Sequence, residues 1–312
     1  MSQLRLGTFN CENLFARFKF NKNVDPNKAS KEGFIVNQVH FDFLKGAEKK
    51  LTADVIKKVD ADVLALQEVE NLDVLKRFRA KELKNKRYKY AILVDGNDPR
   101  KIDVAVLSRY PIVAVRSYQE LRSAKGPIFS RDCLMVDIQV DSKTLVLFVN
   151  HLKSMLDKKD PKNGRKNTRA RRLEQSRAVK KIVQSRFKGS SGKKAWAVLG
   201  DFNDYSEAGQ GTTSGILNLV KWNQVENVVN RLPVNERWTH FYDGATGGET
   251  PYRQLDYILL SKSLADGTSA KPVIERAGLS LKAKDVTVKR LKGVTKTMEA
   301  SDHCPLAIDI KL

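Results

Sequence analysis

The stretch 195–203, Ala-Trp-Ala-Val-Leu-Gly-Asp-Phe-Asn, contains the pattern on which the fold prediction depends. Its first five residues are apolar, as in a buried β-strand, and the run ends abruptly in Gly200-Asp201-Phe202-Asn203. Near the start of the chain, another strand-like run ends in the similar Gly7-Thr8-Phe9-Asn10. This short repeat predicts two packed halves of similar construction, each with polar groups at the end of a strand.

Strand-like runs continue outward from this stretch toward both ends of the chain. Several alternate apolar and polar residues, as half-buried strands do, while residues 44–59 and 74–83 carry apolar side chains at helical spacing. No Pro-, Gly- or Ser-rich linker divides the chain, so we expect one α/β domain over residues 1–312. The expected strands are 4–9, 62–69, 102–107, 134–140, 144–150, 195–200, 255–261 and 305–310.

Composition restricts the class of protein. The 312 residues are 41% hydrophobic, which is enough for a substantial core and excludes a wholly disordered chain. No run reaches the roughly 18 apolar residues of a membrane-spanning helix, and the first residues lack the apolar core of a signal peptide. We therefore expect a cytoplasmic protein, or a secreted one if a leader has been removed. Cys11, Cys133 and Cys304 lack metal-ligand spacing and are expected to be buried hydrophobic residues.

Positive charge is concentrated in one region. The chain has 57 Lys and Arg against 36 Asp and Glu, and residues 151–194 alone contain 16 of the former and three of the latter. Apolar residues such as Val179 and Ile182 recur there at helical spacing, which predicts an amphipathic helix with a basic outer face. Such a field favours a polyanionic partner, nucleic acid first, with an anionic membrane surface as the alternative. The residues expected to bind nucleic acid are Arg169, Arg171 and Arg172.

Polar residues of catalytic type cluster where apolar strands stop. Aligned strands deliver their ends to one edge of a sheet, so we expect these side chains to meet. Carboxylate and carboxamide oxygens with few thiolates suit Mg²⁺, Mn²⁺ or Ca²⁺ better than zinc or copper. With imidazoles beside them, they are the groups that phosphate-ester hydrolysis requires, because negative charge builds on the phosphoryl oxygens. The residues concerned are Asn10, Glu12, Gln67, Glu68, Asn150, His151, Asp201, Asn203, Asp302 and His303.

Eight short motifs follow one another along the chain: Thr8-Phe9-Asn10-Cys11-Glu12-Asn13, Leu66-Gln67-Glu68, Lys101-Ile102-Asp103-Val104-Ala105, Phe129-Ser130-Arg131-Asp132, Asn150-His151-Leu152-Lys153-Ser154, Gly200-Asp201-Phe202-Asn203-Asp204, Gln254-Leu255-Asp256-Tyr257 and Ser301-Asp302-His303-Cys304-Pro305. In this order they resemble the endonuclease/exonuclease/phosphatase superfamily, which includes deoxyribonuclease I-like enzymes and abasic-site endonucleases. The resemblance implies a four-layer α/β sandwich, in which two mixed β-sheets pack face to face with helices outside. It also implies a metal-dependent phosphoesterase site at one end of the sheets.

The resemblance implies a role for each matching residue. Glu68 resembles the principal metal ligand, with Asn10 and Glu12 beside it and Asp302 as a further ligand. Two imidazoles should flank the scissile phosphate, each oriented by a carboxylate, and a further acid should align or deprotonate the attacking water. The two imidazole–carboxylate pairs are His151 with Asp103 and His303 with Asp256, and the further acid is Asp201. The groups expected on the phosphate are Asn203, Arg131 and Lys153.

The motifs leave the substrate open, because the same fold serves nucleases and phosphatases. The basic residues that follow His151 favour a long polyanion over a small phosphate. We therefore expect a monomeric, metal-dependent endonuclease of low sequence specificity that acts on DNA, or on RNA. The alternatives are a repair nuclease for abasic or 3′-blocked ends, a phosphodiesterase or phosphatase for lipid headgroups or small phosphoesters, and a catalytically silent nucleic-acid-binding module. His40 and His240 fall outside the motifs and are expected to be structural or surface residues.

Overall fold

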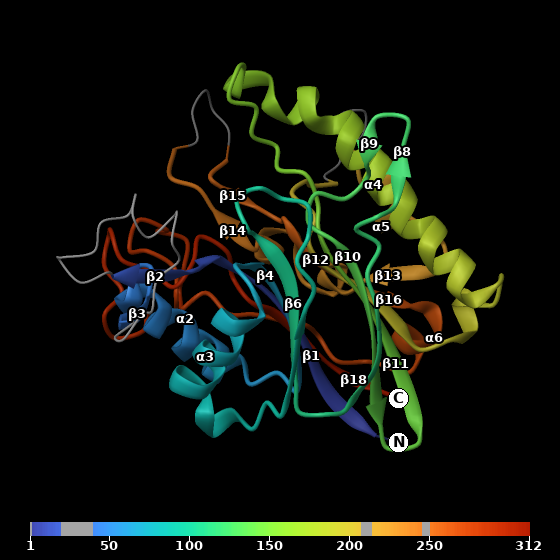
Figure 1. Ribbon diagram of the computed structural model, residues 1–312, viewed down its shortest axis with the longest axis horizontal. Coiled ribbons are helices and arrows are strands. Elements are labelled where there is room, and N and C mark those ends of the chain that lie inside the picture. The colour runs from blue at the N-terminus through green and yellow to red at the C-terminus, as the bar shows by residue number, and fades with distance from the viewer. Residues whose placement is uncertain (1, 20–39, 207–213, 245–249) are drawn as a thin grey trace, which may run out of the picture.

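Two six-stranded β-sheets form the centre of the molecule (Figure 1). They are seen in a computed structural model, which describes every residue except 1, 20–39, 207–213 and 245–249. The strands are β1 Gln3–Leu14, β2 Ala16–Lys19, β3 His40–Phe43, β4 Val63–Val69, β5 Tyr90–Leu93, β6 Asp103–Ser108, β7 Ile112–Arg116, β8 Arg122–Ser123, β9 Gly126–Pro127, β10 Cys133–Val140, β11 Lys143–His151, β12 Trp196–Asp201, β13 Val225–Asn227, β14 His240–Phe241, β15 Tyr252–Arg253, β16 Asp256–Ser261, β17 Val273–Ile274 and β18 Leu306–Lys311. The α-helices are α2 Gly46–Val59, α3 Leu72–Glu82, α4 Gly164–Phe187, α5 Leu217–Val220 and α6 Lys262–Asp266, and short 3-10 helices are Lys84–Lys86, Pro161–Asn163, Ser191–Lys193, Val228–Arg231 and Val234–Glu236.

The two sheets have equivalent topologies. The first has the order β17-β18-β1-β4-β6-β5 and the second β13-β16-β12-β11-β10-β7. Within the described residues each sheet contains one parallel pair, β1 with β4 and β11 with β12, and a helix lies in the connection of each pair. The expected two-half construction is therefore present. The two copies of the short sequence repeat lie on β1 and at the end of β12. These strands are not equivalent in the two topologies, because β1 corresponds to β11 and β4 corresponds to β12.

Apolar side chains fill three spaces between four layers. Leu6 and Val104 of the first sheet face Leu147 and Ile258 of the second, and all four are fully buried. Helices α2 and α3 cover the other face of the first sheet, and α4 and α5 cover the other face of the second (Figure 1). The expected four-layer α/β sandwich is confirmed.

The expected elements are found, with small differences. All eight expected strands are present, and only β1 departs from its expected ends by more than one residue. Helix α4, Gly164–Phe187, lies in the basic segment where an amphipathic helix is expected. Residues 240–241 form β14, which pairs with β15 in a separate two-stranded sheet and is bridged to His303 through His240.

Two expectations from composition concern the cysteines and membrane-spanning helices. All three cysteines are buried and free. Among the helices of the described residues, none combines the length and the apolar character needed to cross a membrane.

Candidate active site

The predicted catalytic side chains meet where the central strands of both sheets end. Asn10 and Glu68 lie near the ends of β1 and β4, while His151 and Asp201 are the last residues of β11 and β12. Asn10 Nδ2 lies 3.1 Å from Asp201 Oδ2 and 3.5 Å from Glu68 Oε1. One carboxamide thus joins carboxylates from the two sheets.

Irregular backbone turns these side chains toward one another. The register of β1 and of β4 shifts at the site residues, as it does at a β-bulge, which redirects a side chain. Glu12, Glu68 and Asn203 have φ angles of 47°, 62° and 50°, in the left-handed region. Non-glycine residues keep this conformation only where their surroundings hold them, and Glu68 Oε2 accepts a hydrogen bond from the Asn13 backbone at 3.1 Å.

Asp201 lies at the centre of the cluster. Its Oδ2 atom is 2.9 Å from Asn203 Nδ2, 3.4 Å from His151 Nε2 and 3.9 Å from His303 Nε2. Burial raises the pKa of Asp201 to about 7; the His303 charge lowers it and the Asp256 charge raises it. A carboxylate with such a pKa accepts a proton from water near neutral pH.

His303 has a second carboxylate partner. Its Nδ1 atom is 2.8 Å from Asp256 Oδ2, which also accepts the Thr239 hydroxyl at 2.8 Å. Burial by itself lowers the pKa of His303, but the charges of Asp256 and Asp201 outweigh it and raise the pKa well above its usual range. The structure thus brings together the expected pair of His303 and Asp256, and it holds an imidazolium whose Nε2 faces Asp201.

His151 differs from its expected arrangement. Burial, together with the positive charges of Arg131 and His303, lowers its pKa well below the usual range, so the ring is neutral. The expected orientation of His151 by Asp103 is not seen: His151 Nδ1 has no hydrogen-bond partner among the described residues, and Asp103 Oδ1 accepts the Gly96 backbone N–H at 2.9 Å. The reason is that Asp103 begins β6 in the first sheet and is turned into its own loop.

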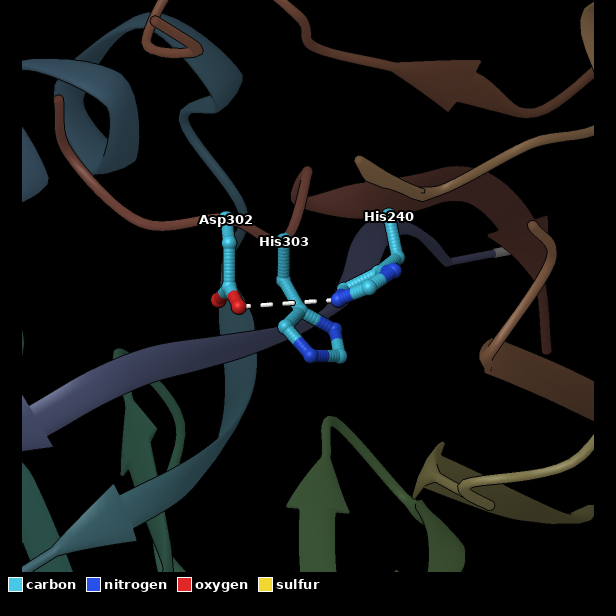
Figure 2. Close-up of side chains that lie close together, drawn as sticks. All are labelled: His240, Asp302 and His303. Atoms are coloured by element: carbon cyan, nitrogen blue, oxygen red, sulfur yellow. Dashed lines mark ion pairs between the residues drawn. The ribbon is translucent and has the colours of Figure 1, made fainter. Parts of the chain in front are cut away.

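His240 belongs to the site, although the sequence analysis placed it outside. Figure 2 shows His240 and Asp302 extending toward each other on either side of His303. His240 Nε2 lies 3.5 Å from Asp302 Oδ2, and the two imidazole rings are 4.7 Å apart. The cause is long-range pairing, because His240 forms an antiparallel bridge with His303. No periodic pattern connects two segments so far apart in the chain; the only local signal is the adjacent Thr239, which binds Asp256.

A model of the endonuclease/exonuclease/phosphatase family matches residues 6–308, a range that includes every residue of this cluster. The chain belongs to this family. Its four-layer sandwich, with polar strand ends gathered at one edge, is the arrangement that the sequence motifs of the family imply.

Solved structures share the family fold at low sequence identity. Truncated TDP2 of Caenorhabditis elegans aligns with a TM-score of 0.61, at 14% identity, over 99% of this chain and 98% of its own. An endonuclease/exonuclease/phosphatase of Beutenbergia cavernae has a TM-score of 0.62 at 16% identity, over 99% and 72%. The human nocturnin catalytic domain with bound sulfate has a TM-score of 0.62 at 14% identity, over 99% and 94%. These identities show the fold alone, and no curated protein matches the chain in sequence.

The candidate metal ligands of this family member lie beside the imidazoles. Burial and the charge of Asp302 raise the pKa of Glu12. Asp302 itself has a pKa far below its usual range, because His240 and His303 outweigh the effect of burial. Within the described residues, two groups of three acidic or imidazole side chains have ligand atoms within 4.8 Å of one another, and neither includes Glu68: His240, Asp302 and His303, and Asp201, Asp256 and His303.

The two expected phosphate-binding cations differ in exposure, since Arg131 is buried and Lys153 is half-buried. The Arg131 side chain is 3% exposed and forms an ion pair with Asp98 at 3.0 Å. Lys153 donates to two backbone carbonyls of its own loop. Arg100, which the sequence analysis did not select, shares Asp98 but keeps 62% of its side chain exposed, and its charge contributes to lowering the pKa of His151. Arg100 is therefore the more accessible cation near the imidazoles.

One predicted nucleic-acid contact is wrong. Arg172 is fully buried, and its Nε lies 2.9 Å from Asp204 Oδ2. This position faces inward because α4 packs this side against the loop that follows β12. Arg171 is half-buried and paired with Glu174 at 2.5 Å, and Arg169 is half-buried on the outer side. Of the three expected arginines, Arg169 and Arg171 thus keep partial exposure and only Arg172 is enclosed.

Proposed function

We propose that this protein is a divalent-metal-dependent phosphodiesterase, and that it cuts nucleic acid endonucleolytically with low sequence specificity. The observation that carries the proposal is the convergence on Asp201 of two imidazoles with opposite pKa shifts, together with carboxamides from both sheets. Groups whose pKa values are pushed apart are typical of a site that both donates and accepts protons. Membership of the family supports phosphoester hydrolysis.

The donor set fits a hard divalent cation. Glu68, Asn10, Glu12 and Asp302 offer oxygen atoms, which Mg²⁺ prefers and which Mn²⁺ and Ca²⁺ also accept. Asp302 disfavours the ionised form of the half-buried Glu12, and a dication would relieve that repulsion. When bound, the cation supplies positive charge to the phosphoryl oxygens.

The protein groups supply the proton transfers. Asp201, with a pKa of about 7, is suited to accept a proton from the attacking water. His303, held as an imidazolium by Asp256, is suited to donate to an oxygen that becomes negative in the transition state. His151 stays neutral and, with its proton on Nε2, adds a hydrogen bond without adding charge.

Charge supports a long polyanionic substrate. The net charge of the chain is +21, and α4, which carries much of the excess, lies next to the loop that follows His151. A small phosphomonoester needs only a few cations, whereas an extended field rewards a chain of phosphates. We propose DNA as the substrate, with RNA as the alternative, and a single domain that acts as a monomer.

The test is cleavage of supercoiled plasmid and of a matched RNA by the purified protein in Mg²⁺, Mn²⁺ or EDTA. We expect nicking that requires a metal ion and that falls by at least about 100-fold in Asp201→Asn, since a general base contributes this much to rate. Asp266→Asn is the matched control, because Asp266 is exposed on α6, outside the described site.

Two results would overturn the proposal. One is an unaltered rate in Asp201→Asn, which would indicate a contaminating nuclease or a different site. The other is intact plasmid and RNA together with metal-dependent hydrolysis of a phospholipid headgroup or a small phosphoester. Cleavage restricted to duplexes with an abasic site or a 3′ block would instead assign the repair activity.

A further inference from the structure

A cavity of about 930 Å³ lies outside the catalytic cluster, between α4 and the segment that runs from β7 to Ile128. We call it the α4 groove. Figure 1 shows this segment, with β8 and β9, alongside α4. Its volume is near the upper end of the range for ligand sites, which is roughly 300–1,000 Å³. None of the catalytic residues described above lines it.

The rim of the α4 groove is cationic. Five basic side chains line it against one acid, Glu174. Arg177 and Lys181 are exposed and have no hydrogen bond or ion pair among the described contacts. Arg186 is paired with Asp137, but the rim as a whole keeps an excess of positive charge, which favours an anion with several charges. The five are Arg116, Arg169, Arg177, Lys181 and Arg186.

The floor of the groove is apolar. Leu121 is 38% exposed there, and Ile128 and Leu173 are half-buried beside it. Tyr118 also lines the groove, with the Arg116 guanidinium 5.1 Å from its ring centroid. An aromatic ring next to a guanidinium is a surface on which an unpaired base stacks. The occupant that fits is therefore both anionic and apolar along its length.

One donor in the groove lacks a partner. Arg169 lines the groove, and its Nε is buried without a hydrogen bond to any described residue. A charged donor that is buried without a partner is unfavourable, so a ligand oxygen that reached it would be favourable. A phosphate oxygen is the acceptor that a guanidinium binds best.

The groove is connected to the catalytic site through Gln175. This buried side chain donates to the Ile128 carbonyl at 3.0 Å and accepts the Lys153 backbone N–H at 2.8 Å. Ile128 is in the wall of the groove, and Lys153 is in the loop that follows His151. The wall of the groove is therefore held directly to the loop that leaves the catalytic site.

We propose that the α4 groove binds an unpaired segment of the nucleic-acid substrate, with phosphates on the cationic rim and bases against the apolar floor. The inference rests on the proposed function and specifies which form of nucleic acid this part of the surface prefers. A duplex presents only its backbone to such a groove, because its bases are stacked inside. An unpaired strand offers both kinds of surface.

The experiment measures binding of a fluorescent 30-nucleotide unpaired DNA, and of the same sequence as a duplex, in EDTA by anisotropy over a range of salt. In Arg177→Glu/Lys181→Glu we expect the dissociation constant for the unpaired strand to rise about tenfold or more. The slope of log affinity against log salt should fall by about 1 to 2, since each single-strand phosphate contact contributes about 0.7. Leu121→Ser should weaken binding of the unpaired strand with an unchanged slope.

The matched control is Lys76→Glu/Lys84→Glu, an equal charge change at exposed residues in and just after α3, on the opposite side of the molecule (Figure 1). Equal losses in control and groove variants would overturn the proposal, as would equal losses for duplex and unpaired strand. Binding of anionic vesicles that only the groove variants lose, with unchanged oligonucleotide binding, would assign the groove to a membrane. If the wild type neither binds nor cuts nucleic acid, the proposed function itself fails, whereas cutting with unchanged binding in the groove variants refutes the groove alone.

Discussion

At the scale of the residue, the site depends on a backbone conformation that only glycine adopts without strain. Gly200 has a φ of 133°, and a Cβ atom at this position would lie 1.9 Å from the Asn150 carbonyl oxygen. The close approach sets β12 tightly against β11, so that Asp201 lies 3.4 Å from His151. Glycine at position 200 is therefore a geometric requirement of the second sheet.

We predict that Gly200→Ala lowers the free energy of unfolding by about 3 to 5 kcal/mol, because the new methyl group meets backbone and the φ angle is unfavourable. Urea denaturation measures this. Gly189→Ala is the matched control: its φ is 84°, but nothing lies within 4 Å of the added atom, so the cost should be about 1 to 2 kcal/mol. Equal losses in the two variants would contradict the role of the close approach.

His240 supports Asp302 rather than packing passively. His240→Phe keeps a ring beside His303 but removes the nitrogen that faces Asp302 at 3.5 Å. Partners of ligating carboxylates typically account for about 10–100-fold in metal affinity, so we expect a loss of this size for Mn²⁺, measured by calorimetry. Tyr242→Phe, an exposed position next to β14, is the control. Unchanged Mn²⁺ affinity in His240→Phe would show that Asp302 is not a ligand or needs no support.

Asp103 contributes a pH dependence of stability. It is 2% exposed, and burial raises its pKa from 3.8 to about 6 against the opposing hydrogen bond from Gly96. The folded carboxyl group holds its proton more tightly than the unfolded one, so its favourable contribution is complete below pH 3.8 and is lost as the pH rises to 6. Relative to Asp103→Asn, we expect the wild type to lose about 2 to 3 kcal/mol between pH 3.8 and pH 6, measured by denaturant unfolding. A constant difference across this range would refute the shift.

At the scale of the element, α4 has two charged faces with opposite roles. Its inner face buries Arg172 against Asp204 and packs Val179 and Ile182 on the second sheet. Its outer face leaves Arg177 and Lys181 exposed. Sequence periodicity alone assigned Arg172 to the basic outer face, because a buried arginine requires an acid from another part of the chain.

We predict that Arg172→Ala destabilises the fold by about 3 to 5 kcal/mol, since it leaves the Asp204 carboxylate buried without this partner. Arg177→Ala, on the exposed face, should change stability by less than about 0.5 kcal/mol. Thermal unfolding followed by circular dichroism distinguishes them. Similar small effects in both variants would mean that Arg165, which also pairs with Asp204, compensates.

At the scale of the whole molecule, the ends of the described chain lie side by side in one sheet. Residues 3–8 of β1 pair with residues 306–311 of β18, and β1 lies between β18 and β4. The strand that carries Asn10 is therefore held by residues about 300 positions away. The hydrogen bond between Asn10 and Asp201 therefore joins a strand held in this way to the second sheet.

Removal of residues 306–312 should prevent cooperative folding. Leu306, Ile308 and Ile310 are at most 1% exposed, and their burial contributes about 5 to 9 kcal/mol, which is comparable with the total stability of a typical domain. Near-UV circular dichroism and a urea titration test this. Lys311→Ala, at an exposed position of the same strand, should leave the transition unchanged. A cooperative transition in the shortened chain at the wild-type midpoint would refute this view of β18.

The sequence by itself determined eight strands of the two six-stranded sheets, the helices α2, α3 and α4, and most of the residues at the site, because alternation, helical spacing and polar strand ends are local properties. Only the tertiary structure decided that Arg172 is buried, that Asp103 turns away from His151 and that His240 faces Asp302. Those three outcomes depend on which charges meet across β-pairings and layer contacts between distant segments. Local sequence patterns do not specify such contacts, which follow from how the two sheets pack.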